Sequence, residues 1–121
     1  MKRIRWELEE MVAMVDLYYR DKNGEVENLN DELSELSRKL NKRADILDID
    51  HDHKFRNLNG MKMIFQNVRY ADTNGEEGMA NTSNLIYDTI DLYNKKHDYF
   101  IVCNMGLKPS PLGETFRLTC L

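Results

Sequence analysis

The stretch Leu8-Glu-Glu-Met-Val-Ala-Met-Val-Asp-Leu-Tyr-Tyr19 carries the strongest structural signal in the 121-residue chain. Its apolar residues recur at the three- and four-residue spacing that places them on one face of an α-helix. Trp6 widens this stripe, and the turn residues Asp21-Lys-Asn-Gly24 end it. The sequence therefore predicts a long amphipathic helix that packs into a core, and we expect Trp6 and Phe65 to be buried there.

Three further segments show the same helical periodicity. The first has a narrow stripe of leucines, at Leu29, Leu33, Leu36 and Leu40. The second begins near Asn59-Gly60 and carries an apolar face made of Met61, Ile64, Phe65 and Val68. The third runs to about His97 after a cap at Thr82 or Ser83. Together with the first stretch, these segments predict four main helices.

The segment 101–121 differs from the rest of the chain. Pro109-Ser-Pro111 and Gly113 exclude a helix there. An alternation typical of a short strand follows at Phe116, Leu118 and Cys120. We therefore predict an all-α domain over residues 1–100, with its first three helices in a helix-turn-helix-like arrangement, and a short irregular or β tail over residues 101–121.

The overall composition is that of a soluble protein of the cell interior. Charged residues make up 31% of the chain, and no apolar run approaches the ~18 residues of a membrane span. Residues 1–6 begin with basic side chains as a signal peptide does, but acidic residues from Glu7 onward interrupt the apolar core that such a signal needs. The two cysteines, Cys103 and Cys120, are too few for a disulfide framework. We expect a cytoplasmic protein with both thiols reduced.

Two segments of this acidic chain contain basic residues and no acid. The net charge is -4, yet residues 36–43 and residues 54–70 each carry four cations. Those of the first segment are Arg38, Lys39, Lys42 and Arg43, and those of the second are Lys54, Arg56, Lys62 and Arg69. This pattern indicates a polarised surface. For the first segment the helix dipole offers a purely structural reason, because cations are favourable near the C-terminus of a helix.

The sequence contains few candidates for catalytic or metal-binding residues. The run Asp48-Ile-Asp-His-Asp-His53 has ligand types that bind divalent cations, but no second half-site with recognisable spacing accompanies it. We therefore expect a solvated acidic loop and no metal. The chain also lacks a Gly-x-Ser-x-Gly sequence and a glycine-rich phosphate loop. We predict no catalytic residue, no cofactor and no enzymatic activity.

The stretch from Phe55 to Asp72, read with three other short motifs, resembles a known family. The three motifs are Trp6-Glu-Leu-Glu-Glu10, Leu17-Tyr18 and Leu33-Ser-Glu-Leu-Ser37. In this order they are similar to the N-terminal helical domain of bacterial HNH-type (McrA-like) restriction endonucleases. The likeness extends over residues 5–100. The chain contains no counterpart of the nuclease region, so the resemblance implies no cleavage, and the last twenty or so residues match nothing in the pattern.

This resemblance implies a DNA-recognition or targeting module in a prokaryotic defence or mobile-element setting, with double-stranded DNA as the partner. The third predicted helix has polar side chains off its apolar stripe that suit a groove. We predict DNA contacts at Arg56, Lys62, Gln66 and Arg69. Phosphate contacts are predicted at Arg38, Lys39, Lys42 and Arg43.

A second interpretation belongs to another class of function. A small acidic protein can bind a protein partner, as a phage-type inhibitor does when it occludes the basic channel of a nucleic-acid-guided nuclease. The net charge of -4 favours this alternative, whereas the basic third helix and the resemblance favour DNA. The sequence leaves the oligomeric state open.

Overall fold

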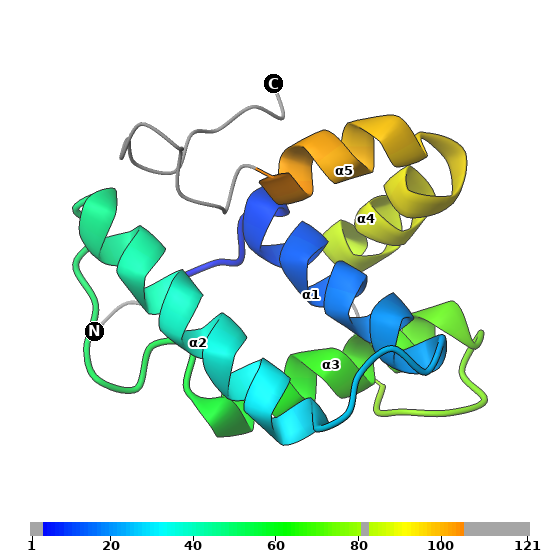
Figure 1. Ribbon diagram of the computed structural model, residues 1–121, viewed down its shortest axis with the longest axis horizontal. Coiled ribbons are helices and arrows are strands. Elements are labelled where there is room, and N and C mark those ends of the chain that lie inside the picture. Colours follow the sequence, from blue (N-terminus) through cyan, green and yellow to red (C-terminus); the bar gives the residue numbers. More distant parts are fainter. Residues whose placement is uncertain (1–3, 81–82, 106–121) are drawn as a thin grey trace.

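A computed structural model describes residues 4–80 and 83–105, and this part of the chain contains five helices and no strand (Figure 1). In chain order these are α1 (Leu8–Lys22), α2 (Leu29–Ile46), α3 (Leu58–Asp72), α4 (Asn84–Lys95) and α5 (His97–Met105). The all-α prediction is confirmed for the described residues, with one helix more than the four predicted. α5 runs across the predicted boundary between residues 100 and 101, and the expected strand-like positions lie outside the described residues.

Polar caps set where two of the helices begin. The side chain of Asn28 accepts a hydrogen bond from the backbone N–H of Asp31 at 3.1 Å, at the start of α2. Asn57 does the same for Gly60 at 2.9 Å, at the start of α3. Each cap satisfies a backbone donor that has no partner within the helix. α3 thus begins immediately after the loop that carries Arg56.

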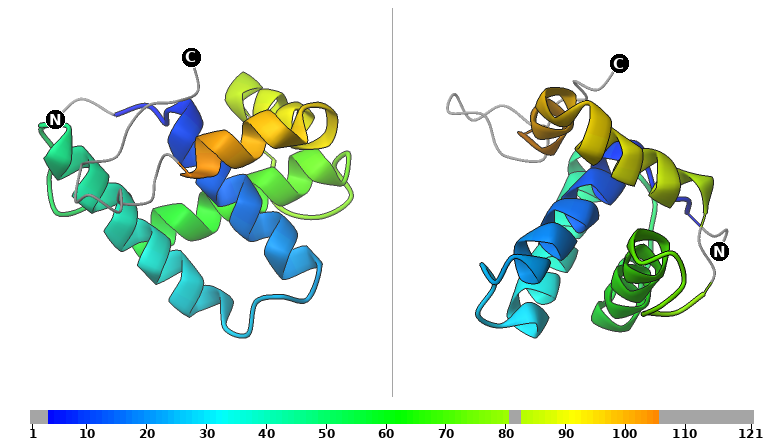
Figure 2. Two further views of the ribbon diagram at one scale, coloured as in Figure 1. Left: turned by 45° about the horizontal axis from the view of Figure 1, so that its top comes forward. Right: turned by 90° about the vertical axis from the view of Figure 1, so that its right-hand side faces the viewer.

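α1 is the central element and packs against each of the other four helices. Figure 2 shows it between α2 and α3 on one side and α4 and α5 on the other. The middle of its apolar stripe is closed to solvent at Met11, Val12, Met14 and Val15. Phe65 of α3 is buried as predicted, but Trp6 is only partly buried, so that half of the prediction is wrong. Trp6 precedes α1 and lies at the edge of the core.

The connection between α2 and α3 is long. It spans residues 47–57, whereas a helix-turn-helix motif joins its two helices by a turn of three or four residues. The first three helices therefore pack together without the tight turn of that motif. Their relative placement depends on side-chain contacts with α1.

Cys103 of α5 is fully buried and disulfide-bonded, so the expectation of a reduced thiol at this position is wrong. Cys120 lies outside the described residues. Within the described ranges, none of the helices has both the length and the apolar character needed to cross a membrane.

Candidate nucleic-acid interface

The N-terminal end of α3 is attached to α1 by the side chain of Arg56. Its guanidinium lies 2.8 Å from a carboxylate oxygen of Glu10, and the two side chains are only 7% and 3% exposed. The remaining guanidinium N–H groups donate to the backbone oxygens of Ile4 at 3.2 Å and Arg5 at 3.1 Å. Arg56 therefore connects the loop before α3 to α1 and to the segment that precedes it.

Aromatic rings and backbone geometry also fix Arg56. The guanidinium carbon lies 4.7 Å from the ring centroid of Trp6 and 4.3 Å from that of Phe55. Its backbone φ of 49° is in the left-handed region, which a residue other than glycine adopts only at a cost. The backbone oxygen of Arg56 accepts a hydrogen bond from the Ser37 hydroxyl of α2. These contacts hold an unfavourable backbone conformation in place.

Arg43 of α2 is likewise used inside the molecule. Its side chain is 2% exposed and donates to Glu7 at 2.8 Å, with Glu9 at 3.7 Å. Its Nε and Nη2 have no hydrogen-bond partner among the residues that the structure describes. The structure places the guanidinium groups of Arg43 and Arg56 in the interior, against glutamates at the start of α1, and not on the open surface where a phosphate or DNA contact was predicted.

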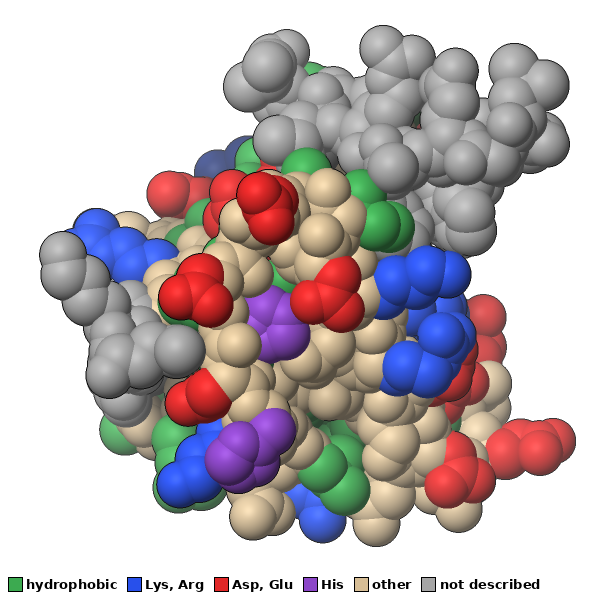
Figure 3. Space-filling model, turned by 90° about the vertical axis from the view of Figure 1, so that its left-hand side faces the viewer, with side chains coloured by type: hydrophobic (Ala, Val, Ile, Leu, Met, Phe, Trp, Pro, Cys, Tyr) green, Lys and Arg blue, Asp and Glu red, His purple; other side chains and the backbone are tan. Residues whose placement is uncertain are grey.

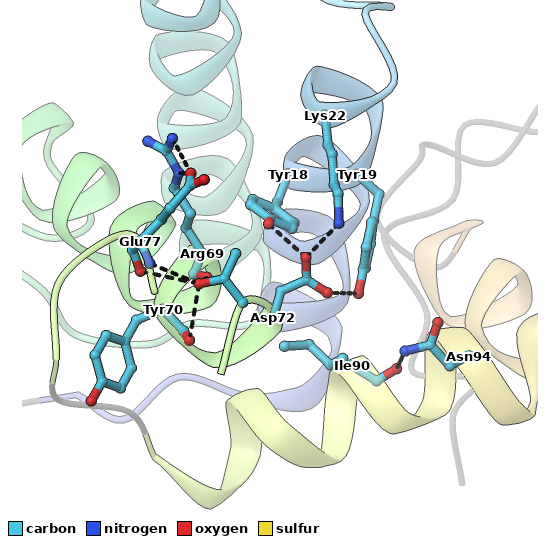
Figure 4. Close-up of polar contacts among 10 residues, drawn as sticks. Tyr18, Tyr19, Lys22, Arg69, Tyr70, Asp72, Glu77, Ile90 and Asn94 are labelled. Atoms are coloured by element: carbon cyan, nitrogen blue, oxygen red, sulfur yellow. Dashed lines mark hydrogen bonds and ion pairs between the residues drawn. The ribbon is translucent and has the colours of Figure 1, made fainter. Parts of the chain in front are cut away.

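The C-terminal end of α3 is attached to α1 by Asp72 (Figure 4). Its carboxylate accepts from the Tyr18 hydroxyl at 2.7 Å, the Tyr19 hydroxyl at 2.6 Å and the Lys22 ammonium at 2.8 Å. Burial opposes ionisation, but hydrogen bonds from Lys22, Tyr19 and Tyr18 outweigh it and hold the pKa of Asp72 below its usual value. Burial, followed by the hydrogen bond to Asp72, raises the pKa of both tyrosines.

The loop of residues 73–80 packs back against the second half of α3. Its Met79 N–H donates to the backbone oxygen of Gln66 at 3.1 Å. The buried side chain of Asn67 donates to the backbone oxygen of Met79 at 2.9 Å. Gly78 sits so close that an added Cβ would lie 2.3 Å from the Gln66 oxygen and 2.7 Å from the Tyr70 nitrogen. The loop thus covers α3 from Gln66 to Tyr70.

The exposed Arg38 and the half-buried Arg69 of the predicted site also have carboxylate partners. Arg38 pairs with Glu35 on the same face of α2, with its Nε 3.1 Å from the carboxylate. Arg69 pairs with Glu77 of the 73–80 loop, with its Nε 2.8 Å from the carboxylate. All four predicted arginines are therefore paired with glutamates of this chain, two in the interior and two at the surface.

The lysines behave differently from the arginines. Lys39, Lys42 and Lys62 are exposed, and none has an ion-pair partner in the described part of the chain. Gln66 is half-buried beneath the 73–80 loop. Lys54 is also exposed, and the sequence-based prediction noted its charge without assigning it a contact. Of the predicted contacts, Lys62 is the cation on the uncovered half of α3.

A hollow of about 330 Å³ opens beside the first half of α3. Its apolar lining includes Trp6, Phe55, Met63 and Ile64, and Lys54 is at its border. Met63 is 52% exposed and so offers apolar surface at the wall of this hollow. Sequence reasoning missed this hollow because its walls come from three separate segments of the chain.

The α2–α3 connection forms an acidic face around its two histidines (Figure 3). His51 lies 2.8 Å from a carboxylate oxygen of Asp45, and its second ring nitrogen is 3.1 Å from the backbone oxygen of Asp52. The hydrogen bond with Asp45, then that with Asp52, raises the pKa of His51. Over residues 4–80 and 83–105, no three histidine, cysteine or acidic side chains are grouped so as to hold a metal ion.

No protein-family model, curated protein or solved structure matches this chain. The motifs behind the family resemblance nevertheless meet in space, since Trp6 and Glu10 contact Arg56, and Tyr18 contacts Asp72. Their described contacts attach α3 to α1 at both ends. What these contacts leave open is the first half of α3, with Lys62, Met63 and the adjacent hollow.

Proposed function

We propose that this chain is a non-catalytic DNA-binding module whose contact surface is the first half of α3. The contrast between arginines and lysines carries the proposal. The arginines at the predicted site are paired with glutamates, whereas Lys62 is exposed without an ion-pair partner among the described residues. A cation that the fold does not use is free to contact a phosphate. The resemblance to the targeting domain of HNH-type endonucleases supports the same function.

Rigidity of α3 also favours this proposal. A helix that contacts DNA must hold its side chains in register with the phosphates, and α3 is anchored at Arg56 and at Asp72. Lys54 precedes α3 and offers a further phosphate contact, as does the exposed Lys42 of α2, whereas Lys39 lines a second hollow with Asp16, Glu32 and Glu35. Because the net charge is -4, we expect weak binding to arbitrary DNA and a strong dependence on salt.

Charge reversal at Lys62 tests the proposal. Lys62→Glu should lower the affinity for a labelled duplex by roughly tenfold, because it replaces a phosphate contact with a repulsive charge. The matched control is Lys96→Glu, which makes the same charge change at an exposed position after α4. Fluorescence anisotropy over a series of salt concentrations measures both variants, and circular dichroism checks their fold. Equal affinities of the two variants would contradict a contact at α3.

The acidic face of the α2–α3 connection favours the second candidate function, binding of a basic protein partner. Its exposed aspartates are Asp48, Asp50 and Asp52 of the connection, together with Asp45 in the last turn of α2. Their reversal to lysine should abolish capture of such a partner and leave DNA affinity unchanged or higher. If Lys62→Glu instead has no effect on DNA and the aspartate reversals release a protein partner, the inhibitor-like function replaces the DNA-binding one.

A further inference from the structure

We propose that the hollow beside Trp6 receives one unpaired nucleobase, so that the DNA bound by this module presents a base outside the double helix. This inference rests on the proposed DNA-binding function and specifies its substrate. Three features of the described residues support it: the shape of the open surface, the apolar surface inside the hollow, and the polar groups at its edge.

The shape of the open surface disfavours a binding mode in which α3 lies along the major groove. Such a reading helix needs a continuous exposed face, but the 73–80 loop covers α3 from Gln66 to Tyr70. The uncovered first half of α3 leads directly into the hollow, where Gly60 and Met63 form part of the wall. DNA bound along the first half of α3 would therefore lie next to a recess, and an unstacked base could enter that recess.

The chemistry of the hollow suits a flat and uncharged group. Trp6 supplies aromatic surface and has the Arg56 guanidinium over its ring, and Met63 adds a polarizable side chain that is half exposed. The charge of Arg56 is compensated by Glu10 at 2.8 Å, so the wall does not act as a phosphate site. Bases stack on aromatic side chains with little regard to their identity, because every base has a π-face.

The polar groups that line the hollow include one lysine, Lys54, and one carboxylate, Asp52. Lys54 is available for a phosphate next to the inserted base, and the Asp52 carboxylate can accept a hydrogen bond from a base edge. Asn57 also lines the hollow; its Oδ1 caps α3. Its Nδ2 has no partner within the described ranges, which leaves a donor for a base edge.

Trp6 is the sole tryptophan of the chain and reports on the hollow directly. Three probes are titrated into the full chain: a perfect duplex, the same duplex with one unpaired adenine, and the corresponding single strand. We expect saturable quenching of Trp6 emission by the two probes with an unpaired base. The perfect duplex should bind, as judged by anisotropy of a label, without comparable quenching.

A matched pair of methionines separates the hollow from a general charge effect. Met63 and Met79 are 52% and 53% exposed, but only Met63 lines the hollow. Met63→Glu should remove the preference for the unpaired base, a loss of roughly tenfold in relative affinity, because it places a charge where the base stacks. Met79→Glu adds the same charge and should keep the preference.

The outcomes distinguish this inference from the proposed function. If the perfect and the bulged duplex bind equally and the two methionine variants behave alike, the base site is overturned while DNA binding stands. If no DNA binds the wild-type chain, both proposals are wrong. If Met63→Glu releases a protein partner and DNA has no effect on Trp6, the hollow receives a protein side chain and the base site is again overturned.

Discussion

At its N-terminal end α3 is attached to α1 by a buried ion pair, and at its C-terminal end by three donors that share a carboxylate. The Arg56 and Glu10 side chains are 7% and 3% exposed. At the other end Asp72 is 11% exposed and Lys22 is 54% exposed. The ion pair at the N-terminal end is therefore shielded from solvent, whereas the contacts of Asp72 at the C-terminal end are partly exposed to it.

This difference determines how each end responds to damage. Removal of one member of a buried ion pair leaves the other charge buried without solvent or a partner. The folded state then loses the attraction that offset the desolvation of that charge, and its stability falls sharply. Removal of one donor from Asp72 leaves two others in place, and water can replace the lost group. We therefore expect failure at the N-terminal end to be abrupt and failure at the C-terminal end to be graded.

The largest expected effect is that of Glu10→Ala. The free energy of unfolding should fall by about 3–5 kcal/mol, because the charge of Arg56 stays buried without its partner. The control is Glu35→Ala, which breaks the exposed pair with Arg38 and should have little effect, because solvent screens both charges. Urea unfolding followed by circular dichroism measures both variants. Equal costs would show that burial does not distinguish the two pairs.

The second effect concerns the loop that covers the C-terminal half of α3. Gly78 and Gly24 both have positive φ, at 86° and 80°, but only Gly78 touches backbone atoms. Gly24→Ala should therefore cost only the backbone strain, about 1–2 kcal/mol. Gly78→Ala should cost more, because the new Cβ overlaps the Gln66 oxygen and the loop must move. A similar loss of stability in both variants would show that the loop is not tightly packed against α3.

Local sequence patterns predicted four of the helices because the apolar stripe of an amphipathic helix can be recognised from residue spacing within one segment of the chain. The fifth helix, α5, escaped because residues 99–103, Tyr-Phe-Ile-Val-Cys, are apolar in succession and form no helical stripe. The course of the long connection before α3 could not be predicted either, because these residues are not helical and have no repeating apolar spacing. The predicted helix-turn-helix-like arrangement of the first three helices lacks its tight turn, because residues 47–57 separate α2 from α3.

The candidate site could be predicted in part for a similar reason. Sequence gives the type and spacing of the basic residues, but not the partner that each one finds in space. Arg56 meets Glu10 at a separation of 46 residues, and Arg43 meets Glu7 at a separation of 36. Such pairs arise only from the packing of α1, so an arginine used by the fold looks the same in sequence as one available for DNA.

The third prediction sharpens the comparison at the C-terminal end. Tyr18→Phe removes one of three donors to Asp72 and keeps the ring that packs against Phe65. The free energy of unfolding should fall by about 1.5–3 kcal/mol, the usual contribution of a hydrogen bond to a charged group. Tyr87→Phe removes a hydroxyl from an exposed tyrosine and should have almost no effect. A loss as large as that of Glu10→Ala would contradict the graded response of this end.

The smallest expected effect is the pH dependence that Asp72 confers. Because the pKa of its carboxyl is held below the usual value, its ionised form stabilises the folded state. This contribution is complete above the unfolded pKa of about 3.9 and is lost as the pH falls through the lower folded pKa. The effect is small because a protonated Asp72 can still accept hydrogen bonds from both tyrosines and loses only its charge interaction with the half-exposed Lys22.

Comparison with Asp72→Asn isolates this contribution. The amide keeps an acceptor for the tyrosine hydroxyls but carries no charge, so it resembles the protonated carboxyl at every pH. We expect the wild type to be more stable than Asp72→Asn at pH 6, and this advantage should shrink toward zero as the pH falls below the unfolded pKa of about 3.9 and through the lower folded pKa. Urea unfolding midpoints at steps of about one pH unit measure the difference. An advantage that persists unchanged at low pH would mean that the charge of Asp72 does not stabilise this end of α3, and that its attachment to α1 depends on the tyrosine hydrogen bonds alone.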